Sequence, residues 1–100
     1  MILPKPEQVR IGGHVYKIVL DKDLGLREGY KGTHGSFDRI ITLDNSGNND
    51  NMTQTFIHEC NEAISRIYCA DRLNHDDIDA LSEGQFQVWQ ELDIKIDWGK

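Results

Sequence analysis

The fold class is decided by residues 52–70, which read MTQTFIHECNEAISRIYCA and carry the first helical hydrophobic period in the chain. At about 100° per residue, the apolar side chains of this stretch fall within an arc of roughly 140°. They are Phe56, Cys60, Ala63, Ile64, Ile67 and Tyr68. We therefore predict an amphipathic helix over about residues 52–70. Asn51, with Gln54 three residues later, predicts a capping box at its start.

A second helix is predicted to follow, with Asn74 as its N-cap. Asp76, Asp77 and Asp79 lie in its first turns, where the positive end of the helix dipole favours carboxylates. Gly84 should cost this helix about 1 kcal/mol relative to alanine. We expect its buried side chains to be Ile78, Leu81, Val88 and Leu92. Residues 92–98 switch to a period of two, so the helix either frays here or is followed by a short strand.

The first half of the chain reads as β structure. Residues 9–11 and 15–20 are β-prone and are separated by Gly12 and Gly13, which predicts a bent strand or a tight hairpin. Residues 21–36 are rich in glycine and predict turns or a loose hairpin arm, and residues 37–43 predict a strand followed by a polar loop. The expected fold is α+β, with a small N-terminal antiparallel sheet packed on two helices in one domain over residues 1–100.

Composition excludes several classes of partner. The formal charge is −6, and Lys and Arg are not clustered, so we expect no nucleic-acid partner. Apolar runs are far shorter than the roughly 20 residues that span a bilayer, so we expect a soluble chain without a membrane partner. Cys60 and Cys69 would lie about 13 Å apart along one helix, too far for a disulfide. Free thiols favour a reducing compartment, which predicts the cytoplasm.

Candidate chemistry lies in the first helix, at His58, Glu59 and Glu62. His58 and Glu62 are four residues apart, so one helical turn stacks them and they can share a metal ion. Glu59 follows the first ligand, as does the general base in the zincin motif, in which ligands at i and i+4 hold zinc. The plain alternative is that these three side chains form an ordinary solvated helix face.

His75 is the candidate for a third ligand. It lies thirteen residues after Glu62, at the start of the second helix, where the dipole favours the neutral imidazole that binds metals. The predicted site is therefore one Zn²⁺ held between the helices by His58, Glu62 and His75, although this donor set also suits Mn or Ni. Without a metal, His75 would be an ordinary residue of a first helical turn.

The chain resembles the small phage and prophage zincins related to the minigluzincins. The resemblance covers residues 11–16, 40–43, 58–64 and 73–84. In the commoner form the first helix carries two histidines and the next helix supplies a glutamate. Here Glu62 stands at the second histidine position and His75 near the place of the glutamate, so the inventory of two imidazoles and one carboxylate is preserved. The resemblance implies a minimal zincin-like domain of phage origin.

The motif and the resemblance together predict a zinc-dependent metallopeptidase-like protein that hydrolyses peptide bonds through a metal-bound water, with Glu59 as the catalytic base. Its partner would be a peptide or protein substrate, paired with the strand at residues 39–43, and its location the host cytoplasm if a phage encodes it. One alternative is a non-catalytic, metal-stabilised module that binds a host protein. Another is a small α/β protein without a metal. The oligomeric state is left open.

Overall fold

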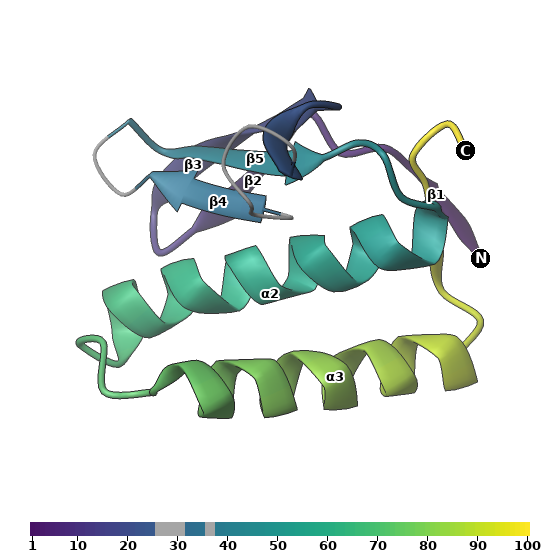
Figure 1. The fold of residues 1–100 in the computed structure, drawn as a ribbon. Coiled ribbons are helices and arrows are strands. Elements are labelled where there is room, and N and C mark those ends of the chain that lie inside the picture. Colours follow the sequence, from purple (N-terminus) through teal and green to yellow (C-terminus); the bar gives the residue numbers. More distant parts are fainter. Residues whose placement is uncertain (26–31, 36–37) are drawn as a thin grey trace.

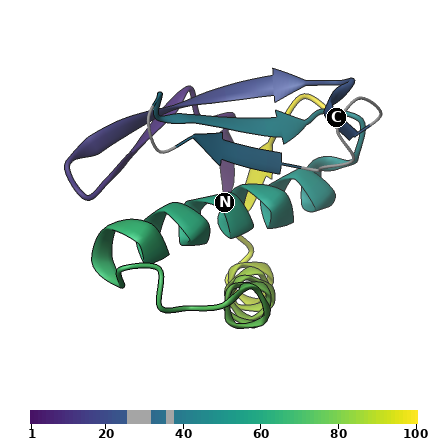
Figure 2. The same cartoon turned by 60° about the vertical axis from the view of Figure 1, so that its left-hand side comes forward.

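The computed structural model describes residues 1–25, 32–35 and 38–100. Its strands are β1 (Ile2–Pro4), β2 (Gln8–Ile11), β3 (His14–Asp21), β4 (Gly32–Gly35), β5 (Ile40–Asp44) and β6 (Lys95–Asp97). Its two long helices are α2 (Asn49–Tyr68) and α3 (His75–Glu91). A sheet with the order β2-β3-β5-β4 covers one side of α2, and α3 lies on the opposite side of α2 (Figures 1 and 2). The predicted α+β fold is confirmed.

The hairpin predicted around Gly12 and Gly13 is formed by β2 and β3, which pair antiparallel with Ile11 opposite His14. Both glycines have positive φ, 59° and 83°, as a tight two-residue turn requires. A Cβ atom at Gly12 would also collide with the Cγ2 methyl of Ile67 on α2. Gly12 therefore serves both the turn and its contact with the helix.

The four-stranded sheet is mixed, so the expectation of an antiparallel sheet was wrong for one pair of strands, β3 and β5. β5 runs parallel to β3, with Lys17 opposite Ile40, and antiparallel to β4, with Gly35 opposite Ile40. The reason is that β4, which precedes β5 in the chain, takes the edge, and β5 then turns back into the position between β3 and β4. The strand expected over residues 37–43 begins at Ile40, because Arg39 has a positive φ of 56°. Phe37 lies outside the described residues.

The hydrophobic core lies between the four-stranded sheet and α2. Ile41 and Leu43 of β5 are fully buried, and Met52, Phe56 and Ala63 face them from α2. The other core side chains are Ile11, Tyr16, Ile18, Ile96 and Trp98. Because β5 is covered by neighbours on both edges and by α2 on one face, it is the most deeply buried strand.

The C-terminal residues form a strand, which answers the question left open for residues 92–98. β6 pairs in parallel with β1, with Leu3 opposite Ile96. Just after β6, the ring of Trp98 meets that of Phe56 edge to face at a centroid distance of 5.6 Å. Its indole Nε1 donates a hydrogen bond of 3.0 Å to Thr53 Oγ1. The two ends of the chain are therefore joined beside the start of α2.

The start of α2 differs from the prediction by three residues. Its N-cap is Asn48, whose side chain accepts from the backbone N–H of Asn51 at 2.8 Å. The side chain of Asn51 accepts in return from the N–H of Asn48, so Asn51 is the second member of the capping box and not the cap. The prediction that Asn74 caps the next helix is confirmed, with Asp77 as its reciprocal partner.

Burial along the helices departs from the predicted apolar stripes. α2 is covered by the sheet on one side and by α3 on the other, so polar Glu59, Asn61 and Ser65 are buried while Tyr68 is exposed. On α3, Ile78 is buried as predicted, but Leu81, Val88 and Leu92 are 47%, 55% and 63% exposed. These three burial predictions were wrong, because α3 meets α2 through a largely polar contact.

That polar contact is centred on Asn61 of α2. Its Nδ2 donates hydrogen bonds of 2.9 Å to Ser82 Oγ and to Gln85 Oε1, both on α3. Ser82 Oγ in turn donates 2.7 Å to the carbonyl of Ile78. Since buried amides are stable only when they are hydrogen-bonded, this network sets the rotation of α3 about its own axis. Leu81, Val88 and Leu92 are turned away from α2 as a result, while Trp89 still packs against the core.

Two further expectations concern the pairing of the cysteines and the presence of membrane-spanning helices. Cys60 and Cys69 are free thiols, in agreement with the prediction that they do not pair. Within residues 1–25, 32–35 and 38–100, neither helix combines the length and the hydropathy that a bilayer crossing demands.

Candidate metal centre

Four ionisable side chains meet where α2 and α3 lie side by side. His58 Nε2 is 3.4 Å from Glu62 Oε1, and His75 Nδ1 is 3.6 Å from the same oxygen. On the other side, His58 Nδ1 is 3.1 Å from Asp79 Oδ1 and His75 Nε2 is 3.4 Å from Asp79 Oδ2. Imidazole and carboxylate groups therefore alternate around a closed ring. The site predicted between the two helices does bring His58, Glu62 and His75 together.

Each helix contributes one histidine and one carboxylate at the same spacing. His58 and Glu62 are four residues apart on α2, and His75 and Asp79 are four residues apart on α3. Residues at this spacing lie one above the other on the same helix face. Fully buried Ile78, next to Asp79, anchors the first turns of α3 against the body of the protein. Local helix geometry thus makes the two pairs, and helix packing brings the pairs together.

Asp79 is the member of the ring that sequence analysis missed as a ligand. His58, His75 and Asp79 each offer a ligand atom, and these atoms all lie within 4.8 Å of one another. Ligand atoms around a tetrahedral zinc are about 3.4 Å apart, so small side-chain rotations would bring the three to one ion. The sequence does contain a signal for Asp79 as a ligand, because Asp79 follows His75 by four residues, as Glu62 follows His58. Its place in the first two turns of the predicted helix suggested an interaction with the helix dipole instead.

Glu62 and Asp79 face opposite nitrogens of each imidazole ring. A single ion binds one nitrogen of a histidine, and the other nitrogen usually donates to a carboxylate that orients the ring. One carboxylate can therefore be a ligand while the other holds both rings in place. The chemistry of this donor set, two imidazoles with carboxylate oxygens, fits Zn²⁺ and similar divalent ions.

Exposure differs across the ring. The side chain of His58 is 21% exposed and that of Glu62 28%, whereas Asp79 is 45% and His75 is 71% exposed. The ring centroids of His58 and His75 are 5.4 Å apart. The α2 side of the site is therefore partly shielded from water, and the α3 side is open to an ion or a ligand from solvent.

Glu59, the predicted catalytic base, lies on a different side of α2 from the α3 interface. It is 7% exposed and sits beneath β4, where a Cβ on Gly32 would lie 3.0 Å from its Cγ and 3.3 Å from its Oε2. The alternative in which His58, Glu59 and Glu62 form an ordinary solvated helix face does not hold for Glu59, because β4 covers this part of α2. Glycine at position 32 is what allows the strand to approach so closely.

β4 is an edge strand of the sheet, whereas β5 has a strand on each side. The prediction that residues 39–43 pair with an extended substrate was therefore wrong, because the backbone groups of β5 already bond to β3 and β4. An edge strand presents unpaired backbone groups on its outer side. Within the four-stranded sheet, β4 combines such an edge with direct contact to Glu59.

Cys60, which lies between the predicted ligands in sequence, does not suit metal binding. Burial, with a smaller contribution from the charge of Glu59, raises the pKa of its thiol to about 12. Metals bind the thiolate, which is scarce at neutral pH when the pKa is this high. Cys60 packs against the core instead.

Comparisons of the chain with protein-family models, with curated proteins and with solved structures found no match.

Proposed function

We propose that this protein is a metal-dependent peptide hydrolase with one Zn²⁺ held between α2 and α3. The observation that carries the proposal is the convergence of ligand atoms from His58, His75 and Asp79 to within 4.8 Å of one another. One further feature supports hydrolysis. Glu59 directly follows His58 on α2, which is the order of first ligand and general base in the zincin motif.

We assign His58, His75 and Asp79 as the ligands. Glu62, which faces both imidazoles, would accept from their remaining ring nitrogens and hold the rings in orientation. The motif alone favours the opposite assignment, with Glu62 as ligand and Asp79 as the orienting group. In both assignments the site contains two neutral imidazoles and a carboxylate ligand.

Zinc bound in such a site acts as a Lewis acid that polarises a carbonyl and makes water a better nucleophile at neutral pH. For this role the side chain of Glu59 has to turn from beneath β4 toward the metal, where it would take the proton from the attacking water and return it to the leaving amine. The outer edge of β4 would hold an extended peptide by main-chain hydrogen bonds, with substrate side chains alternating toward and away from α2. The substrate class is therefore an extended segment of peptide.

The experiment uses tag-free protein, metal analysis by mass spectrometry and a mixed peptide library as substrate. We expect about one equivalent of zinc and detectable cleavage. Glu59→Gln should keep the zinc content and lower the cleavage rate by about 10²–10⁴-fold. Glu83→Gln, an exposed change on α3, is the matched control and should alter neither. Zinc far below one equivalent would refute the metal centre, and cleavage that survives Glu59→Gln would refute the role of Glu59.

A second candidate is a non-catalytic metal clamp in a module that binds another protein. The observation in its favour is that Asp79 presents one carboxylate oxygen to each imidazole, so its two oxygens and the two facing ring nitrogens could close the coordination shell. Structural zinc sites are closed, whereas catalytic sites keep a position for water. Absorption spectra of the cobalt-substituted protein distinguish the two, because a small anion such as azide changes the spectrum only if an open position exists.

We also propose the cytoplasm as the compartment. The proposal is supported by Cys60 and Cys69, which are both free. Expression with a periplasmic signal would test it, since oxidation there should produce disulfide-linked dimers through half-exposed Cys69.

A further inference from the structure

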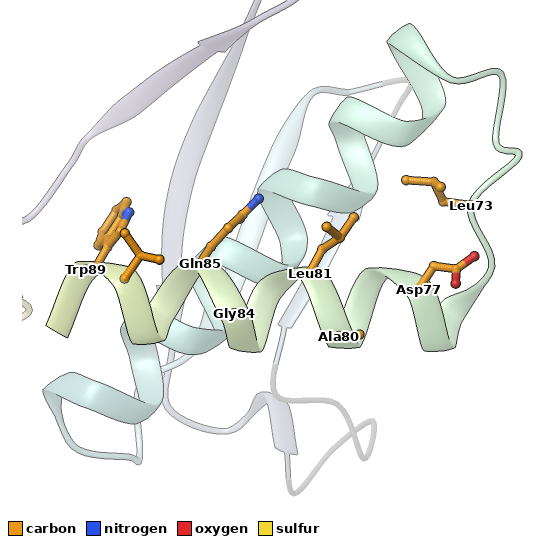
Figure 3. A pocket seen from close by; sticks show the side chains of 8 residues that line it. Leu73, Asp77, Ala80, Leu81, Gly84, Gln85 and Trp89 are labelled. Atoms are coloured by element: carbon orange, nitrogen blue, oxygen red, sulfur yellow. The ribbon is translucent and has the colours of Figure 1, made fainter. Parts of the chain in front are cut away.

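The apolar face of α3 that α2 leaves uncovered forms a groove with a volume of about 750 Å³. Leu81 and Val88, about half exposed, lie along it with Leu73, Ala80 and Trp89 (Figure 3). The groove contains none of the residues of the candidate metal centre, and an inference from it does not depend on the proposed hydrolase function.

The spacing of the groove residues matches a helix-pairing seam. Asp77, Leu81, Gly84 and Val88 follow one another at intervals of four, three and four residues. This is the alternation of a and d positions in a coiled coil, which puts all four on one line along the helix. A stripe of this shape accepts a second helix whose apolar side chains repeat at the same intervals.

Gly84 lies at the middle of this stripe, and no contact or backbone angle of the described residues requires glycine there. A Cβ atom built there meets nothing within 4 Å, and its φ is not in the left-handed region. Glycine weakens an exposed helix relative to alanine, so its presence calls for another explanation. The missing side chain leaves space between Leu81 and Val88 that a large apolar side chain from outside could fill.

The negative charge of α3 indicates which kind of partner the groove can bind. α3 carries no Lys or Arg, and its acidic residues outside the candidate metal centre are Asp76, Asp77, Glu83 and Glu91. Asp77 lines the groove itself. A second copy paired antiparallel about Gly84 would place Asp77 opposite Glu91, and a parallel copy would place each acid opposite itself. Like charges at those positions disfavour self-association, and they also repel an anionic lipid surface.

We propose that the α3 groove binds an amphipathic helix of a partner protein. This helix carries bulky apolar residues at intervals of three and four, one of which fills the space at Gly84, and Lys or Arg on its flanks pair with the acids of α3. The apolar seam provides the contact, and the acidic rim provides the preference for a basic helix.

The test uses the full chain and a synthetic helical peptide of about 18 residues with leucines at these intervals and lysines elsewhere. Binding is followed by calorimetry and by the fluorescence of Trp89, which lines the groove. We expect saturable one-to-one binding. A peptide with the same leucines but glutamates in place of the lysines should bind at least about tenfold more weakly.

Two variants locate the binding. Gly84→Leu places a side chain in this space, where its Cβ meets nothing within 4 Å, and should leave the melting temperature unchanged or higher, while binding weakens by at least about tenfold. The double variant Leu81→Ser with Val88→Ser keeps every charge and should weaken binding similarly, whereas exposed Gln90→Ser should not. Equal binding by the wild type and both groove variants would overturn the proposal. So would dimerisation of the free protein that Gly84→Leu abolishes, since a second copy would then be the occupant.

Discussion

The imidazole rings of His58 and His75 lie 5.4 Å apart, centroid to centroid, although one belongs to α2 and the other to the first turn of α3. Glu62 and Asp79 lie within 3.6 Å of both rings, so two carboxylates are held close together at this place. A divalent cation bound here would offset their like charges. The two histidines therefore connect the packing of the two helices to metal binding.

Substitution of the two carboxylates should reveal which one binds the metal. We expect Asp79→Asn to weaken zinc binding by more than about 100-fold and Glu62→Gln by about tenfold, as for an orienting partner. Asp76→Asn, an exposed change in the same turn of α3, is the control and should have no effect. Competition with a chromophoric chelator measures the affinities. A larger loss of zinc affinity in Glu62→Gln than in Asp79→Asn would show that Glu62 is the ligand.

Zinc should stabilise the fold, because it joins α2 to α3. At a free concentration about 100 times its dissociation constant, zinc adds about 2.7 kcal/mol to the free energy of unfolding. For a chain of this size the melting temperature should rise by roughly 10–20 °C. His75→Ala should abolish the rise without changing the metal-free melting temperature, since this side chain is 71% exposed. Exposed His14→Ala should leave the rise intact, and a rise that persists in His75→Ala would contradict the assignment.

Cys60 should be protected from thiol reagents in the folded protein. Its pKa is raised to about 12, so at pH 8 the group is a neutral thiol, and it is partly buried against the core. We expect Ellman's reagent to modify Cys69 in the native state and Cys60 only after unfolding in guanidinium. In Cys69→Ser no rapid reaction should remain. Rapid modification of Cys60 in that variant would show that this part of α2 is exposed in solution.

The raised pKa of Cys60 also predicts the direction of a pH effect on stability. The folded state holds this proton more tightly than the unfolded state, in which the pKa is near 9. The contribution is complete below pH 9 and is lost as the pH rises toward 12. Cys60→Ala should therefore show a smaller fall in the free energy of unfolding between pH 8.5 and 10.5 than the wild type. Urea denaturation measures the difference, and equal slopes would contradict it.

Two glycine-to-alanine changes should have opposite signs. Gly12→Ala places a side chain at positive φ and against Ile67, so it should lower the free energy of unfolding by more than about 1–2 kcal/mol. Gly84→Ala meets nothing within 4 Å and should raise it by up to about 1 kcal/mol. Urea denaturation of both variants provides the measurement. A stabilising Gly12→Ala would mean that the hairpin turn differs from the one described.

The parts of the fold that were predicted correctly depend on local signals. The hairpin at Gly12 and Gly13, the helix at residues 52–70 and the N-cap at Asn74 each follow from residues within one turn or one strand pair. The parallel pairing of β5 with β3 could not be predicted, since it depends on β4 taking the edge. The exposure of Leu81 and Val88 was likewise unpredictable, because the contact made by Asn61 rotates α3 away from its apolar side.

For the candidate site, the sequence by itself determined the two pairs at helical spacing, since residues four apart on a helix share a face whatever surrounds them. Only the tertiary structure decided that the pairs meet, that Asp79 joins them, and that Glu59 lies under β4 and away from α3. The physical reason is that helical period sets relative directions within one element. Which face of a helix is buried, and which side chains that face contacts, depend on how separate elements pack.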